Sequence, residues 1–194
     1  MSPRGDVRAC HTAQSGSRQR PQRPGKPPAA LFPGALDGES HGSYANGCHA
    51  CELEIDPETG EVAILAYTAV DDFGEVLNPA AVRGQVQGGV AQGLGQALME
   101  LVAYGPESGQ ILAASLMDYA VPRADHVPDV HWIDNGLMSR TIIFGAKACG
   151  EAAAGAAPPA VMNAIVDALT AFPVARALQM PARATDIWRV IHGA

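Results

Sequence analysis

A single carboxylate in a run of small residues is the strongest chemical signal in this chain. Glu151 follows the Gly/Ala-rich residues 144–150, and more small residues and Pro158-Pro159 come after it. A carboxylate on such a loop can approach a bulky ligand closely, and burial there would disfavour its ionised form and suit it to act as a general base. Lys147 is the only local cation. In a helix the two would form an ordinary surface ion pair at i,i+4 spacing, but the local glycines favour a loop.

Residues 84–96 form a second candidate site because they combine five glycines with four glutamines. Their apolar periodicity is helical, whereas a dinucleotide fingerprint would follow a strand and a tight turn. A glycine-rich helix start offers N–H groups to a phosphate or a pterin, and a glutamine amide both donates to and accepts from a heterocycle. The alternative is a tightly packed helix with glutamines on its wet face. The residues alone leave both readings open.

Cys48-His49-Ala50-Cys51 is a single C-x-x-C motif with no second pair. Structural zinc needs four ligands, so a zinc site would have to recruit His41, His49 or a remote residue. The alternation after Cys51 predicts a strand with the two thiols on opposite faces. Half-buried or buried thiols in a reducing, cytoplasmic compartment are therefore the favoured reading.

The composition limits the classes of protein that remain. The chain has 194 residues, 47% of them hydrophobic but only 5% aromatic, and a net charge of −7. The negative charge argues against nucleic acid as a partner. Apolar runs stay below the roughly 18 residues that a membrane span needs. Motifs typical of serine hydrolases, zincins and P-loop enzymes are missing from the sequence.

Residues 1–42 are expected to be a disordered tail. Residues 1–30 hold six Lys/Arg against one acid, about +5, which leaves about −12 for the rest. This segment has five prolines and almost no apolar residues, a composition typical of disorder. The prolines also disfavour the amphipathic helix of a mitochondrial transit peptide.

The remaining pattern predicts an α+β fold, with a hairpin-type or mixed sheet packed against two main helices. Alternation predicts strands at 50–55 and 62–70, joined by an Asp-Pro-Glu-Thr-Gly turn. Asn78-Pro79 opens a helical pattern at 81–104. Further predicted elements are strands at 110–114 and 127–134, a helix opened by Pro158-Pro159 over 160–172, and a last short helix capped by Thr185 or Asp186.

Several segments carry a family resemblance when they are read in order. They are Asn46-Gly47-Cys48-His49, the 56–62 turn, Asp71-Asp72-Phe73-Gly74 with Asn78-Pro79, Gly84-Gln85-Val86 running on to residue 98, Met117-Asp118-Tyr119, Pro122-Arg123-Ala124, Gly145-Ala146-Lys147 with Gly150-Glu151, Ala157-Pro158-Pro159-Ala160 and Trp188-Arg189. Together they resemble the C-terminal part of the molybdopterin-binding large subunit of the xanthine oxidase/aldehyde oxidase family. The carbon monoxide dehydrogenase-like and isoquinoline oxidoreductase-like bacterial branch is the most similar.

The resemblance covers about residues 44–192 and implies a function. It implies oxidative hydroxylation of an aldehyde, an N-heterocycle or a related substrate, with water as the oxygen source and molybdopterin, in its cytosine dinucleotide form, as cofactor. Glu151 would be the catalytic base. The implied cofactor-binding residues are Gln85, Gly88, Gly89, Gln92, Gly93, Lys147 and Gly150. No residue of the chain is implied as a direct metal ligand.

The resemblance also implies what this chain lacks. Family large subunits are several times longer, and residues before Tyr44 do not resemble them, so 43–194 is expected to be a C-terminal fragment of the cofactor-binding domain. It would be inactive alone, and its partners would be the remainder of the large subunit, an FAD subunit and a 2Fe-2S subunit. A non-catalytic remnant or assembly module, and a small Cys/His metal-binding module, remain as alternatives.

Overall fold

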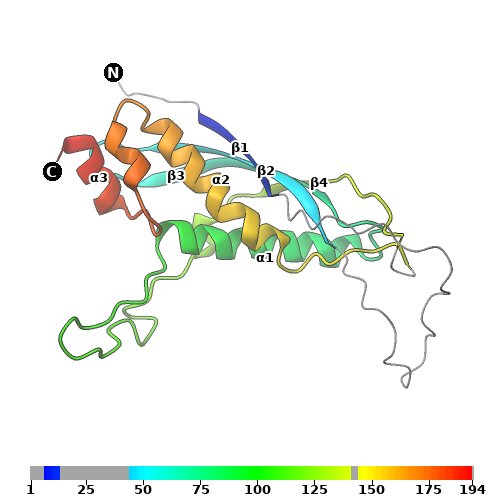
Figure 1. The fold of residues 1–194 in the computed structure, drawn as a ribbon, viewed down its shortest axis with the longest axis horizontal. Coiled ribbons are helices and arrows are strands. Elements are labelled where there is room, and N and C mark those ends of the chain that lie inside the picture. The colour runs from blue at the N-terminus through cyan, green and yellow to red at the C-terminus, as the bar shows by residue number, and fades with distance from the viewer. Residues whose placement is uncertain (1–6, 14–43, 141–143, 194) are drawn as a thin grey trace, which may run out of the picture.

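A four-stranded mixed sheet forms one layer of the molecule (Figure 1). The computed structural model describes residues 7–13, 44–140 and 144–193. The strands are β1 (Val7–Ala13), β2 (Asn46–Ile55), β3 (Val62–Asp72) and β4 (Val130–Asp134), in the order β1-β2-β3-β4. The first three pair antiparallel, and β4 runs parallel to β3.

Two long helices form the second layer. They are α1 (Pro79–Leu98) and α2 (Ala152–Ala168), which pack against each other, while α2 also lies against β1 and β2 (Figure 1). The short helices are η1 (Ala124–His126), η2 (Pro173–Ala177) and α3 (Ala184–His192). The predicted α+β class with a mixed sheet and two main helices is confirmed.

The predicted hairpin is present and its turn explains the sequence. Asp56 accepts hydrogen bonds from the Glu58 N–H and the Thr59 hydroxyl, each at 2.9 Å. Gly60 adopts φ +76°, which favours glycine. A side chain at Gly60 would also collide with the Ala184 carbonyl oxygen, 2.1 Å from an added Cβ, so the turn is where α3 packs.

Glycines on α1 allow the backbones of α1 and α2 to pack closely against each other. A Cβ on Gly89 would lie 2.8 Å from the Ala153 Cβ, and one on Gly93 would lie 2.5 Å from the Ala157 Cβ. The neighbouring apolar residues of α1, including Val86, Val90 and Leu94, are buried in the same core. The alternative of a tightly packed glycine helix therefore describes this side of α1.

Several predicted elements differ from the structure, and the largest difference is the start of α2. α2 begins at Ala152, not at residue 160, and Pro158 and Pro159 lie inside it. An internal proline costs a hydrogen bond and crowds the preceding turn. Here Pro158 is buried, and its Cδ would lie only 2.8 Å from a Cβ on Gly93, so packing against α1 outweighs that cost.

The other boundary errors concern α1, the loop after it and α3. α1 ends at Leu98 rather than near 104. The predicted strand at 110–114 is replaced by one isolated bridge between Tyr104 and Ile111. Arg183, not Thr185 or Asp186, is the N-cap residue of α3, and Asp186 instead pairs with the Arg183 and Arg189 guanidinium groups.

The predicted tail lies mostly outside the described residues. Val7–Ala13 differ from the expectation of disorder, because their backbone pairs in register with β2 from Leu53 to Gly47. Over the described ranges, none of the helices is both long and apolar enough to cross a membrane.

The helix contact yields a test of stability. Gly93→Ala is expected to lower the free energy of unfolding by about 1–3 kcal/mol, because the added methyl group overpacks the contact with Ala157 and Pro158. Gly84→Ala is the matched control. No atom lies within 4 Å of an added Cβ there, so the better helix propensity of Ala should raise stability by up to about 1 kcal/mol. Urea unfolding of the two variants measures both, and equal effects would contradict the close packing.

Candidate functional site

A pocket of about 220 Å³ lies where β3, α1 and the loop before α2 converge. The start of α1 forms one side of the pocket, and the local sequence explains why the helix begins there. The Asn78 side chain accepts a hydrogen bond from the Ala81 N–H at 3.1 Å and caps α1. The lining residues are Phe73, Glu75, Val76, Leu77, Asn78, Ala81, Val82, Gln85, Ala146, Lys147 and Cys149. The pocket thus gathers segments that are far apart in the sequence, including the predicted site residues Gln85 and Lys147.

Glu151 lies two residues after Cys149, which lines the pocket, at the N-terminus of α2. It is the N-cap residue, its carbonyl oxygen accepts from the Gly155 N–H at 3.1 Å, and its side chain makes no capping hydrogen bond. The preceding Gly150 brings the loop against α1, since a Cβ there would lie 3.6 Å from Gln85 Oε1. The burial that would disfavour the ionised form of Glu151 is not seen in this chain, where its side chain is exposed.

Lys147 is engaged elsewhere. Its ammonium group forms an ion pair with Asp72, and both side chains are nearly covered, at 13% and 14% exposure. The i,i+4 ion pair with Glu151 that a helix would have allowed is therefore not the contact that Lys147 makes. The backbone of Lys147 is also held, because its N–H donates to the Phe73 carbonyl oxygen at 2.7 Å.

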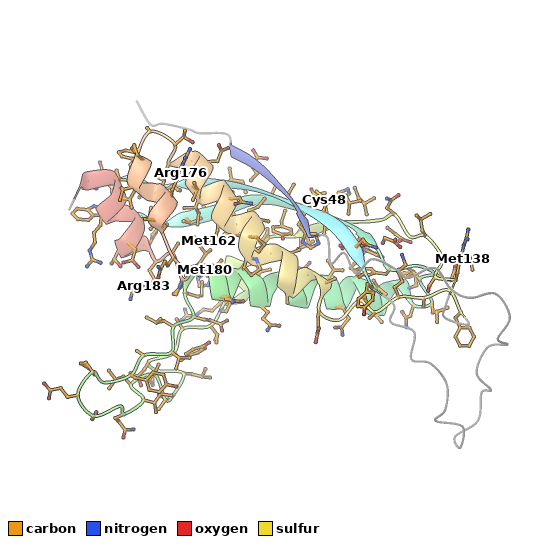
Figure 2. The ribbon with its side chains drawn as sticks, viewed as in Figure 1. Cys48, Met138, Met162, Arg176, Met180 and Arg183 are labelled. Carbon is orange, nitrogen blue, oxygen red and sulfur yellow. The ribbon has the colours of Figure 1, made fainter. Side chains whose placement is uncertain are left out.

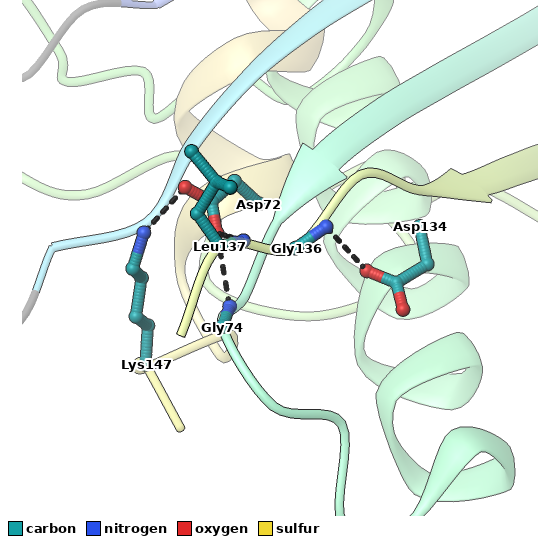
Figure 3. A network of polar contacts seen from close by, with 6 residues as sticks. All are labelled: Asp72, Gly74, Asp134, Gly136, Leu137 and Lys147. Carbon is teal, nitrogen blue, oxygen red and sulfur yellow. Dashed lines mark hydrogen bonds and ion pairs between the residues drawn. The ribbon is translucent and has the colours of Figure 1, made fainter. Parts of the chain in front are cut away.

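Asp72 is the centre of the polar network at the end of β3 (Figure 3). Its Oδ1 accepts from the Gly74 N–H at 3.0 Å and the Leu137 N–H at 2.8 Å, and its Oδ2 accepts from Lys147 Nζ. Partial burial raises the pKa of Asp72, but the bonds from Lys147, Leu137 and Gly74 outweigh it, so the pKa lies below its usual value of 3.8. The carboxylate is thus held ionised.

The predicted residues of α1 divide between two faces. Gln85, Gly88 and Gln92 are exposed on one face, and no atom lies within 4 Å of an added Cβ on Gly88. Gly89 and Gly93 face α2 and are buried. Packing of α1 against α2 accounts for these two glycines, and contact of any of the five with a cofactor stays a prediction.

Two structural roles were not visible in the sequence. The Gln87 amide donates to the Pro128 carbonyl oxygen at 3.0 Å and accepts from the Val130 N–H at 3.4 Å, so it secures the start of β4. Asp72 belongs to the segment Asp71-Asp72-Phe73-Gly74 that contributes to the family resemblance, but the sequence predicted no role for it. Its position at the end of a predicted strand is the one signal that could have pointed to it.

The Cys/His motif lies on β2, away from this pocket (Figure 2 labels Cys48). His49 is fully buried, with Nδ1 2.9 Å from the Tyr67 hydroxyl and Nε2 3.1 Å from Asp71 Oδ1. Burial raises the pKa of the Cys51 thiol to about 12, with a smaller contribution from Glu52, which disfavours a metal-binding thiolate. Among the described residues no group of three or more His, Cys, Asp and Glu side chains could hold a metal, and His41 lies outside them.

Comparison with known proteins agrees with this architecture. Residues 22–128 match the model of the molybdopterin cofactor-binding domain, which is more than half of the chain. The chain belongs to this family. The match begins inside the predicted tail, which corrects the expectation that residues before Tyr44 are unlike the family, and it ends before Lys147 and Glu151.

Individual relatives cover more of the chain. It is 38% identical over 145 residues to the nicotine 6-hydroxylase large subunit of Paenarthrobacter nicotinovorans, which is 75% of this chain and 18% of that protein. Among solved structures, quinoline 2-oxidoreductase from Pseudomonas putida 86 matches with a TM-score of 0.70 and 37% identity over 76% of this chain and 19% of that one. Reconstituted CO dehydrogenase from Oligotropha carboxidovorans matches with a TM-score of 0.73 and 31% identity, over 77% and 18%. The chain spans about a fifth of the length of these relatives.

The described residues fit one side of a cofactor site. Gly88 leaves the exposed face of α1 open to close approach, and Gln85 places an amide in the pocket. The first turn of α2 adds backbone N–H groups that suit an anionic group.

The Asp72 network predicts a pH-dependent contribution to stability. A carboxylate with a lowered pKa stabilises the folded state above its unfolded pKa, and the contribution is lost as pH falls through the folded value. Asp72→Asn is therefore expected to reduce the free energy of unfolding at pH 7 by about 1–3 kcal/mol, with the difference from wild type shrinking below about pH 4.

Urea unfolding of both proteins between pH 7 and pH 3 measures this difference. Asp134→Asn is the control, because within the described residues the Asp134 side chain accepts from the nearby Gly136 N–H, at 3.0 Å, and makes no ion pair. A difference that stays constant over this pH range would contradict an ionised Asp72.

Proposed function

We propose that this chain forms the base-bearing side of the molybdopterin site of a molybdenum hydroxylase. The observation that carries the proposal is that Gln85 and Lys147 line one pocket, while Gly150, directly before Glu151, contacts Gln85: a Cβ on Gly150 would lie 3.6 Å from Gln85 Oε1. The reaction would be oxidative hydroxylation of an aldehyde, an N-heterocycle or a related substrate, with water as the source of oxygen. Family membership supports the cofactor, and its cytosine dinucleotide form is part of the proposal.

The residues around the pocket would have different roles in binding the cofactor. Gln85 and Gln92 offer amides to the heterocycle, while Gly88 and Gly150 leave room for it to approach the backbone. Lys147 shapes the loop through Asp72. The bound cofactor would supply the two-electron redox chemistry.

Glu151 would act as the general base. Its carboxylate would accept the proton of the water that provides the oxygen atom, and a positioned base of this kind contributes about 10²–10⁴-fold to rate. Its exposure in this chain is consistent with a site whose other wall is supplied by a partner.

The partners follow from the same comparison. The chain spans about a fifth of its relatives, so we propose that it works with the remainder of a large subunit and with FAD and 2Fe-2S subunits. Eighteen large hydrophobic side chains are exposed in the described residues, among them Leu116 and Met117, which suits a surface that other protein covers. The substrate would be a small molecule bound between the chains.

Replacement of the proposed base tests the function. The full chain would be co-expressed with complementary large-subunit, FAD and iron–sulfur chains, and molybdenum content and dye-linked oxidation of aldehydes and N-heterocycles would be measured. Glu151→Gln should lower kcat by about 10²–10⁴-fold with unchanged molybdenum content, because it removes a proton acceptor without changing size.

Glu58→Gln is the control, because Glu58 lies in the hairpin turn. An active wild type whose Glu151→Gln variant keeps full turnover would show that the catalytic assignment is wrong. A folded complex that never acquires molybdenum would favour the alternative of a non-catalytic assembly module.

Replacement of Gln85 tests cofactor binding separately. Gln85→Ala removes the pocket amide and should lower the molybdenum content of the complex severalfold, whereas Gln96→Ala should leave it unchanged because Gln96 is exposed on α1 outside the pocket. Equal molybdenum content in wild type and Gln85→Ala would contradict the assignment of Gln85.

A further inference from the structure

We propose that Asp72 is a positioning residue that fixes the loop carrying Glu151. This inference rests on the proposed function and adds to it a residue with no assigned role. Asp72 does not line the pocket and would not touch substrate or cofactor. It would act through the loop before α2.

Asp72 ties the end of β3 to two segments that lie 65 and 75 residues later in the chain (Figure 3). One carboxylate binds Gly74 on the β3 extension, Leu137 after β4 and Lys147 in the loop before α2. Backbone hydrogen bonds reinforce the same contacts. The Lys147 N–H donates to the Phe73 carbonyl oxygen at 2.7 Å, and the Glu75 N–H donates to the Gly145 carbonyl oxygen at 3.0 Å.

The three segments also touch at backbone distance. Gly74 has φ +67°, and a Cβ there would lie 2.2 Å from the Gly145 carbonyl oxygen. A Cβ on Gly136 would lie 2.2 Å from the Gly74 carbonyl oxygen. Gly145, at φ +68°, is buried beside Met138, which Figure 2 labels. A small shift of the backbone at Gly74 or Gly136 would therefore also displace the loop before α2.

The position of Glu151 depends on two anchors because its own side chain makes no capping bond. One anchor is the contact of Ala153, the second residue of α2, with Gly89 on α1. The other is Lys147, four residues before Glu151, which Asp72 holds at β3. Loss of the Asp72 anchor would free the N-terminal side of the Glu151 loop while α2 stayed packed.

An ordinary surface ion pair would not have this effect. Exposed pairs contribute little because water and salt screen them. Here both partners are about seven-eighths covered, and the same carboxylate accepts two backbone N–H groups. An asparagine could keep the two N–H bonds on its single oxygen, but its amide nitrogen cannot accept from Lys147. Asp72→Asn thus breaks the link to the loop selectively.

Hydrogen exchange on the full 194-residue chain tests the anchoring without any cofactor. In Asp72→Asn, the amides of Lys147 and Glu75 should exchange at least about tenfold faster, because they bond across the anchored contact. Lys147→Met should have the same effect and serves as a second variant if Asp72→Asn fails to fold. Asp134→Asn, the control, should leave exchange at Lys147 and Glu75 unchanged, because its amide oxygen can still accept from the Gly136 N–H and it makes no bond to the loop before α2. Unchanged exchange at Lys147 and Glu75 in both variants would overturn the proposal.

Kinetics of the assembled complex test the consequence for Glu151. Asp72→Asn should lower kcat at least about tenfold with little change in KM or molybdenum content, since the base is displaced rather than removed. The Asp72→Asn/Lys147→Met double variant should be no slower than either single variant, because the two act as one unit. A purely structural role would lower stability and leave kcat unchanged.

The two failures are distinguishable. A kcat that stays at the wild-type value in Asp72→Asn, in a complex that Glu151→Gln inactivates, would overturn the positioning role alone. Full turnover by Glu151→Gln would defeat the proposed function instead, and the exchange measurement would still decide whether Asp72 anchors the loop.

Discussion

The close contact between α1 and α2 is the constraint on which the rest of this structure depends. Gly89 and Gly93 allow Ala153 and Ala157 to approach α1 at a distance that any side chain would prevent. The contact fixes the depth and the direction of α2, and therefore the place of its first residues. Because Glu151 caps α2, the packing of small residues in the core decides where the proposed base stands.

The polar C-terminal end of β3 is the second contact that holds the loop before α2 in place. Asp72 lies between a buried Asp71 and a buried Phe73, and it leaves the sheet where three connections meet. One carboxylate satisfies two backbone N–H groups and one ammonium group there, which a neutral side chain cannot do. The sheet thus offers a rigid support to a loop that is built almost entirely of small residues and has few side chains of its own to hold it.

Parts of the fold could be predicted because their signals are local. Alternating residues and an Asp-Pro-Glu-Thr-Gly turn define the hairpin, and Asn78-Pro79 marks the start of α1. The start of α2 could not be predicted, because a proline is typical of the first turn of a helix. Pro158 is tolerated inside α2 because it packs against Gly93 on α1, a contact that the sequence does not reveal. Likewise, the local glycines favoured a loop around Lys147 but could not name its partner, because Asp72 lies 75 residues earlier in the chain.

The sequence by itself determined the family, the secondary structure around the hairpin and α1, and the choice of Glu151, Gln85 and Lys147 as residues worth examining. These features depend on which residue types follow one another along the chain, so they can be predicted without knowing any tertiary contact. Only the tertiary structure decided that Gly89 and Gly93 face α2 while Gly88 stays open, that Glu151 is exposed, and that Asp72 holds Lys147. The physical reason is that each of these outcomes depends on a neighbour from a distant segment, and the order of residues along the chain does not specify which neighbour that is.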